Sequence, residues 1–124
     1  MSTTIDYFRN STDFETFAAG DVIFKQGDAS AGRMYVVIGG EVDVTINGKF
    51  VHTIGEGGIV GEMALIDTQP RSATVTAKVE SKLVPVDEAR FKFMVQQTPF
   101  FAIQVMRVLV ERLREATAIG AEYL

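Results

Sequence analysis

Short runs of β-branched and aromatic residues, divided by glycine-containing turns, fill the chain from about residue 14 to residue 87. Within residues 41–46, charged or polar side chains alternate with valine and isoleucine, the pattern of a strand with one buried face. Asn47-Gly48 follows at once and is a strong hairpin signal, so residues 49–54 are expected to form the returning strand. Four other segments have a strand-forming composition: residues 22–24, 34–38, 72–79 and 82–86. This succession predicts a β-sandwich or jelly roll.

The hydrophobic period changes after Asp87, and two helices are expected. Asp87 is a suitable N-cap for a helix over residues 88–97, and the Thr-Pro pair that follows restarts a helix with Pro99 in its first turn. This last helix is expected over residues 99–119, ending at Gly120. It has two apolar stripes: Phe101, Val105, Leu109, Ala116 and Ile119 on one, and Ile103, Met106, Val110 and Leu113 on the other. One stripe is expected to pack on the core, and the other to meet a bound ligand or another chain.

Length, charge and composition narrow the possible functions. The 124 residues suffice for one domain with a single core, expected to span residues 1–124. A net charge of −4 argues against nucleic acid as a partner, because binding along a phosphate backbone requires a basic face. The chain has no cysteine and a single histidine, His52, which excludes Cys-ligated metals and sites with several His ligands; His52 is interpreted as a half-exposed strand residue. No signal peptide or membrane-spanning run is visible, so a cytoplasmic protein without a membrane partner is expected.

The segment 61–75, with the sequence GEMALIDTQPRSATV, carries the candidate chemistry. The planar guanidinium of Arg71 can bind two phosphate oxygens, whereas the carboxylate of Glu62 repels phosphate but accepts a hydrogen bond from a neighbouring hydroxyl. Main-chain N–H groups of Met63 and Ala64 can add further donors. The pattern therefore favours a sugar phosphate. Taken without the rest of the segment, a Glu and an Arg at this spacing more often form a structural ion pair.

This segment closely resembles the phosphate-binding cassette of cyclic nucleotide-binding domains, in which Gly-Glu, three apolar or small residues and a spacer precede Pro-Arg-small-Ala-Thr/Ser-apolar. Residues 17–28 and 35–42 resemble strand signatures of the same family. The resemblance implies a mainly β fold: a double-stranded β-helix, or jelly roll, over about residues 14–87. It also implies a short N-terminal helix, a helical turn in the cassette and two C-terminal helices over about residues 88–120.

The same resemblance assigns roles to cassette residues. It implies that Glu62 binds the ribose 2′-hydroxyl, that Arg71 binds the cyclic phosphate, and that Ser72 adds a polar contact. The slot for the base is expected among Val44, Val51, Ile59 and the last helix, and the Ser72 hydroxyl can serve adenine or guanine. The expected ligand-binding residues are Gly61, Glu62, Met63, Ala64, Arg71, Ser72, Ala73 and Arg112.

Arg112 occupies an unusual place for a charge, between Leu109 and Ala116 on the first apolar stripe of the last helix. One interpretation is that it extends to solvent or pairs with Glu111 or Glu115. The other is that its guanidinium stacks on the purine of the bound nucleotide as a lid. The sequence leaves both interpretations open.

The resemblance implies a regulatory domain that binds cAMP, or less readily cGMP, without altering it and without a metal or cofactor. Movement of the helices from residue 88 onward would pass the signal to an effector protein, or to a second copy through the second stripe of the last helix. The alternative is a ligand-independent protein-interaction module on the same jelly roll. An enzyme is not expected, because the chain offers neither a cluster of histidines nor a plausible nucleophile–base pair.

Overall fold

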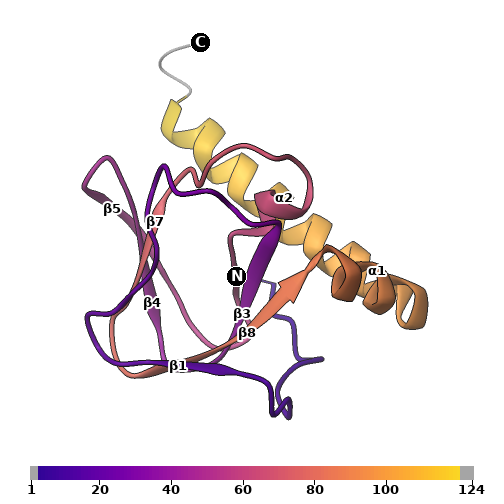
Figure 1. Cartoon of the computed structure of the whole chain (residues 1–124). Coiled ribbons are helices and arrows are strands. Elements are labelled where there is room, and N and C mark those ends of the chain that lie inside the picture. Colours follow the sequence, from indigo (N-terminus) through magenta and orange to yellow (C-terminus); the bar gives the residue numbers. More distant parts are fainter. Residues whose placement is uncertain (1–2, 121–124) are drawn as a thin grey trace.

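The described part of the chain, residues 3–120 of a computed structural model, folds into eight short strands followed by two helices (Figure 1). Side chains are described for residues 3–116. The strands are β1 (Glu15–Phe17), β2 (Val22–Phe24), β3 (Arg33–Gly39), β4 (Val42–Ile46), β5 (Lys49–Ile54), β6 (Ile59–Val60), β7 (Thr74–Ala77) and β8 (Ser81–Asp87). A 3₁₀ turn, η1 (Glu62–Leu65), follows β6, and the helices are α1 (Glu88–Gln97) and α2 (Pro99–Gly120).

The strands form two antiparallel sheets of four strands each. One sheet has the order β1-β8-β3-β6 and the other has the order β2-β7-β4-β5. Neighbouring strands come mostly from distant parts of the sequence: Val36 of β3 lies opposite Val84 of β8, and Val44 of β4 lies opposite Val75 of β7. This interleaving is that of a jelly roll, so the expected mainly β fold is confirmed.

The hairpin predicted at Asn47-Gly48 joins β4 to β5. Asn47 and Gly48 have φ angles of 53° and 78°, the positive values that a type I′ turn requires. The predicted alternation holds for residues 42–45, because Val42 and Val44 are buried while Asp43 and Thr45 are partly exposed. Ile46, at the end of the strand, departs from it and is 40% exposed. Local sequence signals therefore determine this half of the second sheet.

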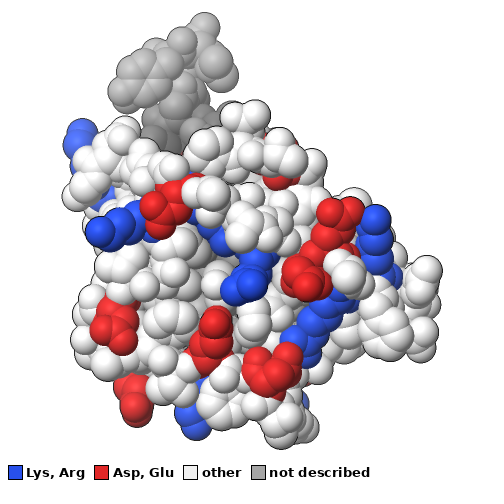
Figure 2. All heavy atoms as spheres, viewed as in Figure 1, with Lys and Arg blue, Asp and Glu red and all other residues white. Residues whose placement is uncertain are grey.

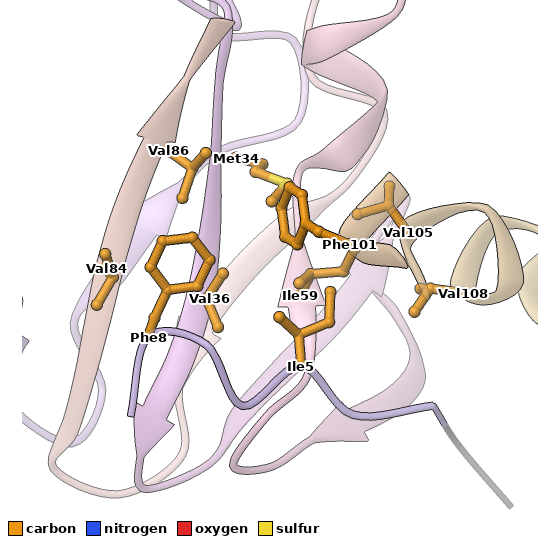
Figure 3. Packing of buried hydrophobic residues seen from close by; sticks show 10 residues of the cluster. All are labelled: Ile5, Phe8, Met34, Val36, Ile59, Val84, Val86, Phe101, Val105 and Val108. Carbon is orange, nitrogen blue, oxygen red and sulfur yellow. The ribbon is translucent and has the colours of Figure 1, made fainter. Parts of the chain in front are cut away.

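Two clusters of buried residues form the hydrophobic core. The first lies between the β3–β8 sheet and α2, and Figure 3 shows Phe101 of α2 among side chains of β3, β6 and the N-terminal segment. The second cluster fills the space between the two sheets and includes Phe24, Val75 and Leu83. Because Val60 of β6 and Val75 of β7 both belong to it, this second cluster fixes the two strands on either side of the cassette.

The predicted helix α1 begins at the predicted cap: the Asp87 carboxylate accepts a hydrogen bond from the main-chain N–H of Arg90 at 2.8 Å. At the start of α2, the main-chain N–H of Phe101 donates a hydrogen bond to the Thr98 carbonyl, also at 2.8 Å. Both turns follow from the residue types that the sequence places there.

Helix α2 buries one face and leaves another uncovered. Phe101, Val105 and Val108 are at most 5% exposed. Val108, which is not in the predicted stripe, is buried, whereas Leu109, which is in the stripe, is only partly buried. The residues of the second stripe, which we call the outer seam, are 41–67% exposed: Ile103, Met106, Val110 and Leu113. Among the described residues, no helix is long and apolar enough to span a membrane.

The short N-terminal helix expected from the resemblance does not form between residues 3 and 13. Residues 7–10 make a turn, with hydrogen bonds from Arg9 N–H to Asp6 O and from Ser11 N–H to Phe8 O. The segment is instead held by burial of Ile5 and Phe8, which are 1% and 2% exposed. Because one turn of helix is costly to nucleate, packing of these two side chains decides the local conformation.

Candidate functional site

The main cavity has a volume of about 620 Å³ and lies between the second sheet, the cassette (residues 61–75) and α2. Its wall is mostly apolar and includes Phe24, Val44 and Val51. All eight residues predicted from the sequence line it: Gly61, Glu62, Met63, Ala64, Arg71, Ser72, Ala73 and Arg112. A mostly apolar cavity of this size with a few convergent polar groups is typical of a small-molecule site.

Arg71 brings a buried positive charge to the cavity wall. The residue is 8% exposed, and its backbone is fixed by bonds of 2.8 Å from its N–H to Asp28 O and from Gly27 N–H to its own carbonyl. Burial lowers the pKa of the Arg71 guanidinium from its ordinary value, although an arginine remains protonated at neutral pH. Among the described residues no carboxylate lies within ion-pair distance of Arg71, and its Nε atom is buried without a hydrogen-bond partner. Such a group is suited to binding an anion.

Gly61 lies directly against this guanidinium. One Nη atom of Arg71 donates to the Gly61 carbonyl at 3.4 Å. A Cβ atom on Gly61 would lie 2.5 Å from that nitrogen and 3.2 Å from the ring of Phe24, and the φ angle of Gly61 is 73°. Only glycine satisfies both the positive φ and the close approach. Gly61 is one of the predicted site residues, and Arg71 and Phe24 are the neighbours that require glycine there.

Glu62 forms an ion pair with Arg112 of α2, and not with Arg71. The Glu62 side chain is 7% exposed and the Arg112 side chain 25% exposed. Arg112 also donates a hydrogen bond to the main-chain carbonyl of Ile59. Among the described residues Glu62 and Arg71 form no ion pair, and the ion pair of Arg112 is with the cassette glutamate and not with Glu111 or Glu115 of its own helix. The register of α2 on the core brings Arg112 to the cassette, so this pair joins the cassette to the last helix.

The remaining cassette residues differ in their contributions. The Ala64 N–H donates to the Gly61 carbonyl at 3.1 Å, so this expected donor is already engaged within the turn. Met63 is 49% exposed, and the Ser72 hydroxyl lies 3.8 Å from its sulfur atom. Ala73 is partly buried against the core between the sheets. Ser72 is thus the exposed hydroxyl next to Arg71 at the cavity wall.

Not every residue named for the expected base slot lines the main cavity. Val44 and Val51 line the cavity, but Ile59 is fully buried in the first core cluster and borders a smaller cavity of about 170 Å³. Several cavity residues were not predicted as site residues, among them Phe24, which β2 places under Arg71, and His52 of β5. Burial, and next the positive charge of Arg112, lower the pKa of His52. No local sequence signal marks either residue, because their roles depend on contacts between distant segments.

Charges elsewhere on the molecule are mixed. On the face shown in Figure 2, Lys and Arg side chains lie among Asp and Glu side chains and form no continuous basic surface. Within the part of the chain that the structure describes, no group of three or more His, Cys, Asp or Glu side chains is arranged to hold a metal ion. The charged residues that line the main cavity are Glu62, Asp67, Arg71, Arg112 and Glu115, and of these Glu62 and Arg71 are buried.

Comparisons with known proteins agree with this geometry. Among solved structures, the chain is similar to the catabolite activator protein of Thermus thermophilus, at 28% identity and a TM-score of 0.79 over 89% of this chain and 54% of that one. It is similar to the N-terminal domain of a transcriptional regulator from Streptomyces coelicolor A3(2), at 30% identity and a TM-score of 0.64 over 90% of this chain and 82% of that one. A structure described under a cyclic-GMP-dependent signalling pathway that regulates bacterial phytopathogenesis is 28% identical, with a TM-score of 0.72, over 82% of this chain and 84% of that one.

The first of these comparisons involves a longer protein, since this chain spans only 54% of the Thermus thermophilus chain. The family match covers most of this chain: residues 14–98 match the family described as the cyclic nucleotide-binding domain. The matched residues include the strands of both sheets and the whole cassette. The chain therefore belongs to the cyclic nucleotide-binding domain family.

Proposed function

We propose that this protein is a regulatory domain that binds a cyclic nucleotide in the main cavity and signals through α2. The observation that carries the proposal is the buried guanidinium of Arg71, which has no carboxylate partner among the described residues and lines a cavity of about 620 Å³. In this proposal Arg71 neutralises the cyclic phosphate and Glu62 accepts a hydrogen bond from the ribose 2′-hydroxyl. An anion with an adjacent hydroxyl is the ligand that matches both groups.

Titration calorimetry with cAMP and then cGMP tests this proposal directly. Replacing Arg71 by alanine should weaken binding by about 2–5 kcal/mol, as expected for a buried charge that loses its partner, or about 30- to 4000-fold in Kd. Arg107→Ala is the matched control, since it removes the same charge from an exposed position of α2 outside the cavity lining. Absence of binding by the wild-type protein, or equal binding by both variants, would overturn the proposal and favour a ligand-independent interaction module.

The preferred ligand in this proposal is cAMP. Much of the cavity wall is apolar, including Val44 and Val51 of the expected base slot, and Ser72 offers one hydroxyl. Both bases carry an amino group, but guanine adds a carbonyl and a ring N–H that also need partners when buried, so an apolar slot favours adenine. One similar structure is described under a cyclic-GMP-dependent pathway, so the ratio of the two measured affinities is the decisive quantity.

The signal in this proposal begins at the Glu62–Arg112 ion pair. A ribose hydroxyl that donates to Glu62 competes with Arg112 for the same carboxylate, and any change in that pair acts on α2. The ligand shifts the balance between two positions of α2 only by the difference in its affinity for them. The role is binding alone, so cyclic nucleotide incubated with the protein should be recovered unchanged.

The partner that we propose for the outer seam is a second copy of this chain. Ile103, Met106, Val110 and Leu113 follow one another at spacings of three, four and three residues, which is the a/d repeat of a coiled coil. Arg107 and Arg114 then occupy e positions. Antiparallel helices would place these arginines opposite each other, whereas parallel helices place them opposite Ala102 and Leu109 of the other copy, so the charges favour a parallel pair.

A further inference from the structure

An aromatic ring, and not a carboxylate, supports the guanidinium of Arg71. The Cζ atom of Arg71 lies 4.0 Å from the centroid of the Phe24 ring. Three other cation–ring contacts among the described residues are longer, at 4.9 to 5.2 Å. Phe24 and Arg71 are 9% and 8% exposed, so water screens this contact little.

The Phe24 ring is itself rigidly placed. It stacks on Tyr35 of β3, with ring centroids 6.3 Å apart and an angle of 28° between the ring planes. Both rings belong to the core cluster between the two sheets. The close approach of Gly61 restricts the guanidinium from another direction, so the guanidinium is confined between a fixed ring and a backbone turn.

We propose that Phe24 is a positioning residue for anion binding by Arg71, an inference that rests on the proposed function. The negative face of the ring attracts the guanidinium and fixes its plane without accepting any of its N–H groups in the usual in-plane directions. A carboxylate at the same place would occupy those N–H groups and cancel the charge. The Nε–H is buried without a partner, and the Gly61 carbonyl, 3.4 Å from one Nη atom, is the one acceptor of the guanidinium among the described residues, so the ring leaves the charge of Arg71 without a competing anion.

The test compares Phe24→Leu, which keeps an apolar side chain without a ring, with Phe24→Tyr, which keeps the ring. Phe24→Leu should weaken cAMP binding about 3- to 30-fold, the range expected for a buried cation–π contact. Phe24→Tyr should bind like the wild type. Phe14→Leu is the matched control, because the Phe14 ring faces Lys82 at 5.0 Å and does not line the cavity.

A spectroscopic measurement separates positioning from a general loss of packing. In the ligand-free protein, the ring current of Phe24 should shift the Arg71 Nε–H proton signal upfield. That shift should disappear in Phe24→Leu and persist in Phe24→Tyr and Phe14→Leu. Wild-type affinity in Phe24→Leu, an equal loss in Phe24→Tyr, or an unmoved Nε–H signal would each overturn the inference.

Failure of the proposed function is distinguishable from failure of this inference. If the wild-type protein binds neither cAMP nor cGMP, the proposed function fails. The same three variants are then titrated with inorganic phosphate, and the Arg71 Nε–H signal is followed. A phosphate response that is lost only in Phe24→Leu supports the positioning role, and a response that is the same in all variants, or absent from the wild type, overturns it.

Discussion

Replacing Gly61 by alanine adds one methyl group at the point where the cassette backbone meets the Arg71 guanidinium. The new Cβ would lie 2.5 Å from an Arg71 nitrogen, so that nitrogen must move by about 1 Å to reach an ordinary contact distance. The end of a free arginine side chain would move easily. Here the Phe24 ring, 4.0 Å from Arg71 Cζ, restricts that movement, and the same Cβ would also crowd the ring at 3.2 Å.

Two costs add in Gly61→Ala. A φ angle of 73° costs a residue with a side chain about 1–2 kcal/mol, and crowding in a packed site costs a further ~1–3 kcal/mol. Gly48→Ala is the matched control, since Gly48 has a φ of 78° but nothing within 4 Å of its would-be Cβ. At about 4 °C per kcal/mol for a domain of this size, the control should lose about 4–8 °C in Tm and Gly61→Ala about 4–12 °C more.

Thermal unfolding followed by circular dichroism measures the loss of Tm, and titration with cAMP measures the loss of affinity. Because the displaced guanidinium is the proposed phosphate-binding group, Gly61→Ala should also bind at least about 10-fold more weakly. Gly48→Ala should bind like the wild type. Equal losses of Tm in the two variants, together with unchanged affinity in Gly61→Ala, would refute the close-approach argument.

Three further outcomes are expected. Arg112→Ala should lower the free energy of unfolding by about 1–3 kcal/mol, because it leaves Glu62 as a buried charge without its partner. The loss is smaller than for a fully buried pair because the Arg112 side chain is 25% exposed. Urea denaturation measures it, with Arg114→Ala as the control. Because the pKa of His52 lies below its ordinary value of 6.5, the unfolded chain binds a proton that the folded chain resists. Stability should therefore fall as the pH drops through 6.5, and less so in His52→Gln. Leu113→Glu should abolish concentration-dependent dimerisation in sedimentation velocity, with little loss of Tm because Leu113 is 67% exposed.

A different result would contradict each of these three predictions. Equal stability of the Arg112 and Arg114 variants would mean that the pair with Glu62 contributes nothing. An identical pH dependence in His52→Gln would assign the acid sensitivity to other groups. A wild-type protein that stays monomeric at every concentration would leave the outer seam to an effector protein.

Local signals in the sequence determine much of what the structure contains. The alternation over residues 41–46 with Asn47-Gly48 gives the β4–β5 hairpin, and Asp87 gives the start of α1. The cassette was recognisable because its residues are contiguous, so one short motif placed seven residues at the cavity. These features depend on neighbours in the chain, which a sequence displays directly.

The contacts that were not predicted join residues far apart in the chain. The pairing of Arg112 with Glu62 depends on how α2 docks, and a rotation of the helix would send Arg112 to another neighbour. The support of Arg71 by Phe24 depends on the pairing of β2 with β7. The N-terminal segment illustrates the same limit, because its conformation depends on the burial of Ile5 in a core built by distant strands.

Helix α2 is packed on the core only over its first half, so a small tilt of the helix moves its C-terminal end much further. Its buried contacts end at Val108, and beyond them Glu111 and Arg112 hold it through polar contacts, to Thr3 and to the cassette. At about 1.5 Å per residue, Arg112 lies about 6 Å and Gly120 about 18 Å past Val108. A tilt about Val108 that moves Arg112 by about 1 Å therefore moves the end of the helix by about 3 Å. A displacement of Arg112 on the scale of one exchanged hydrogen bond is thus about three times larger at Gly120, because Gly120 lies about three times as far from Val108.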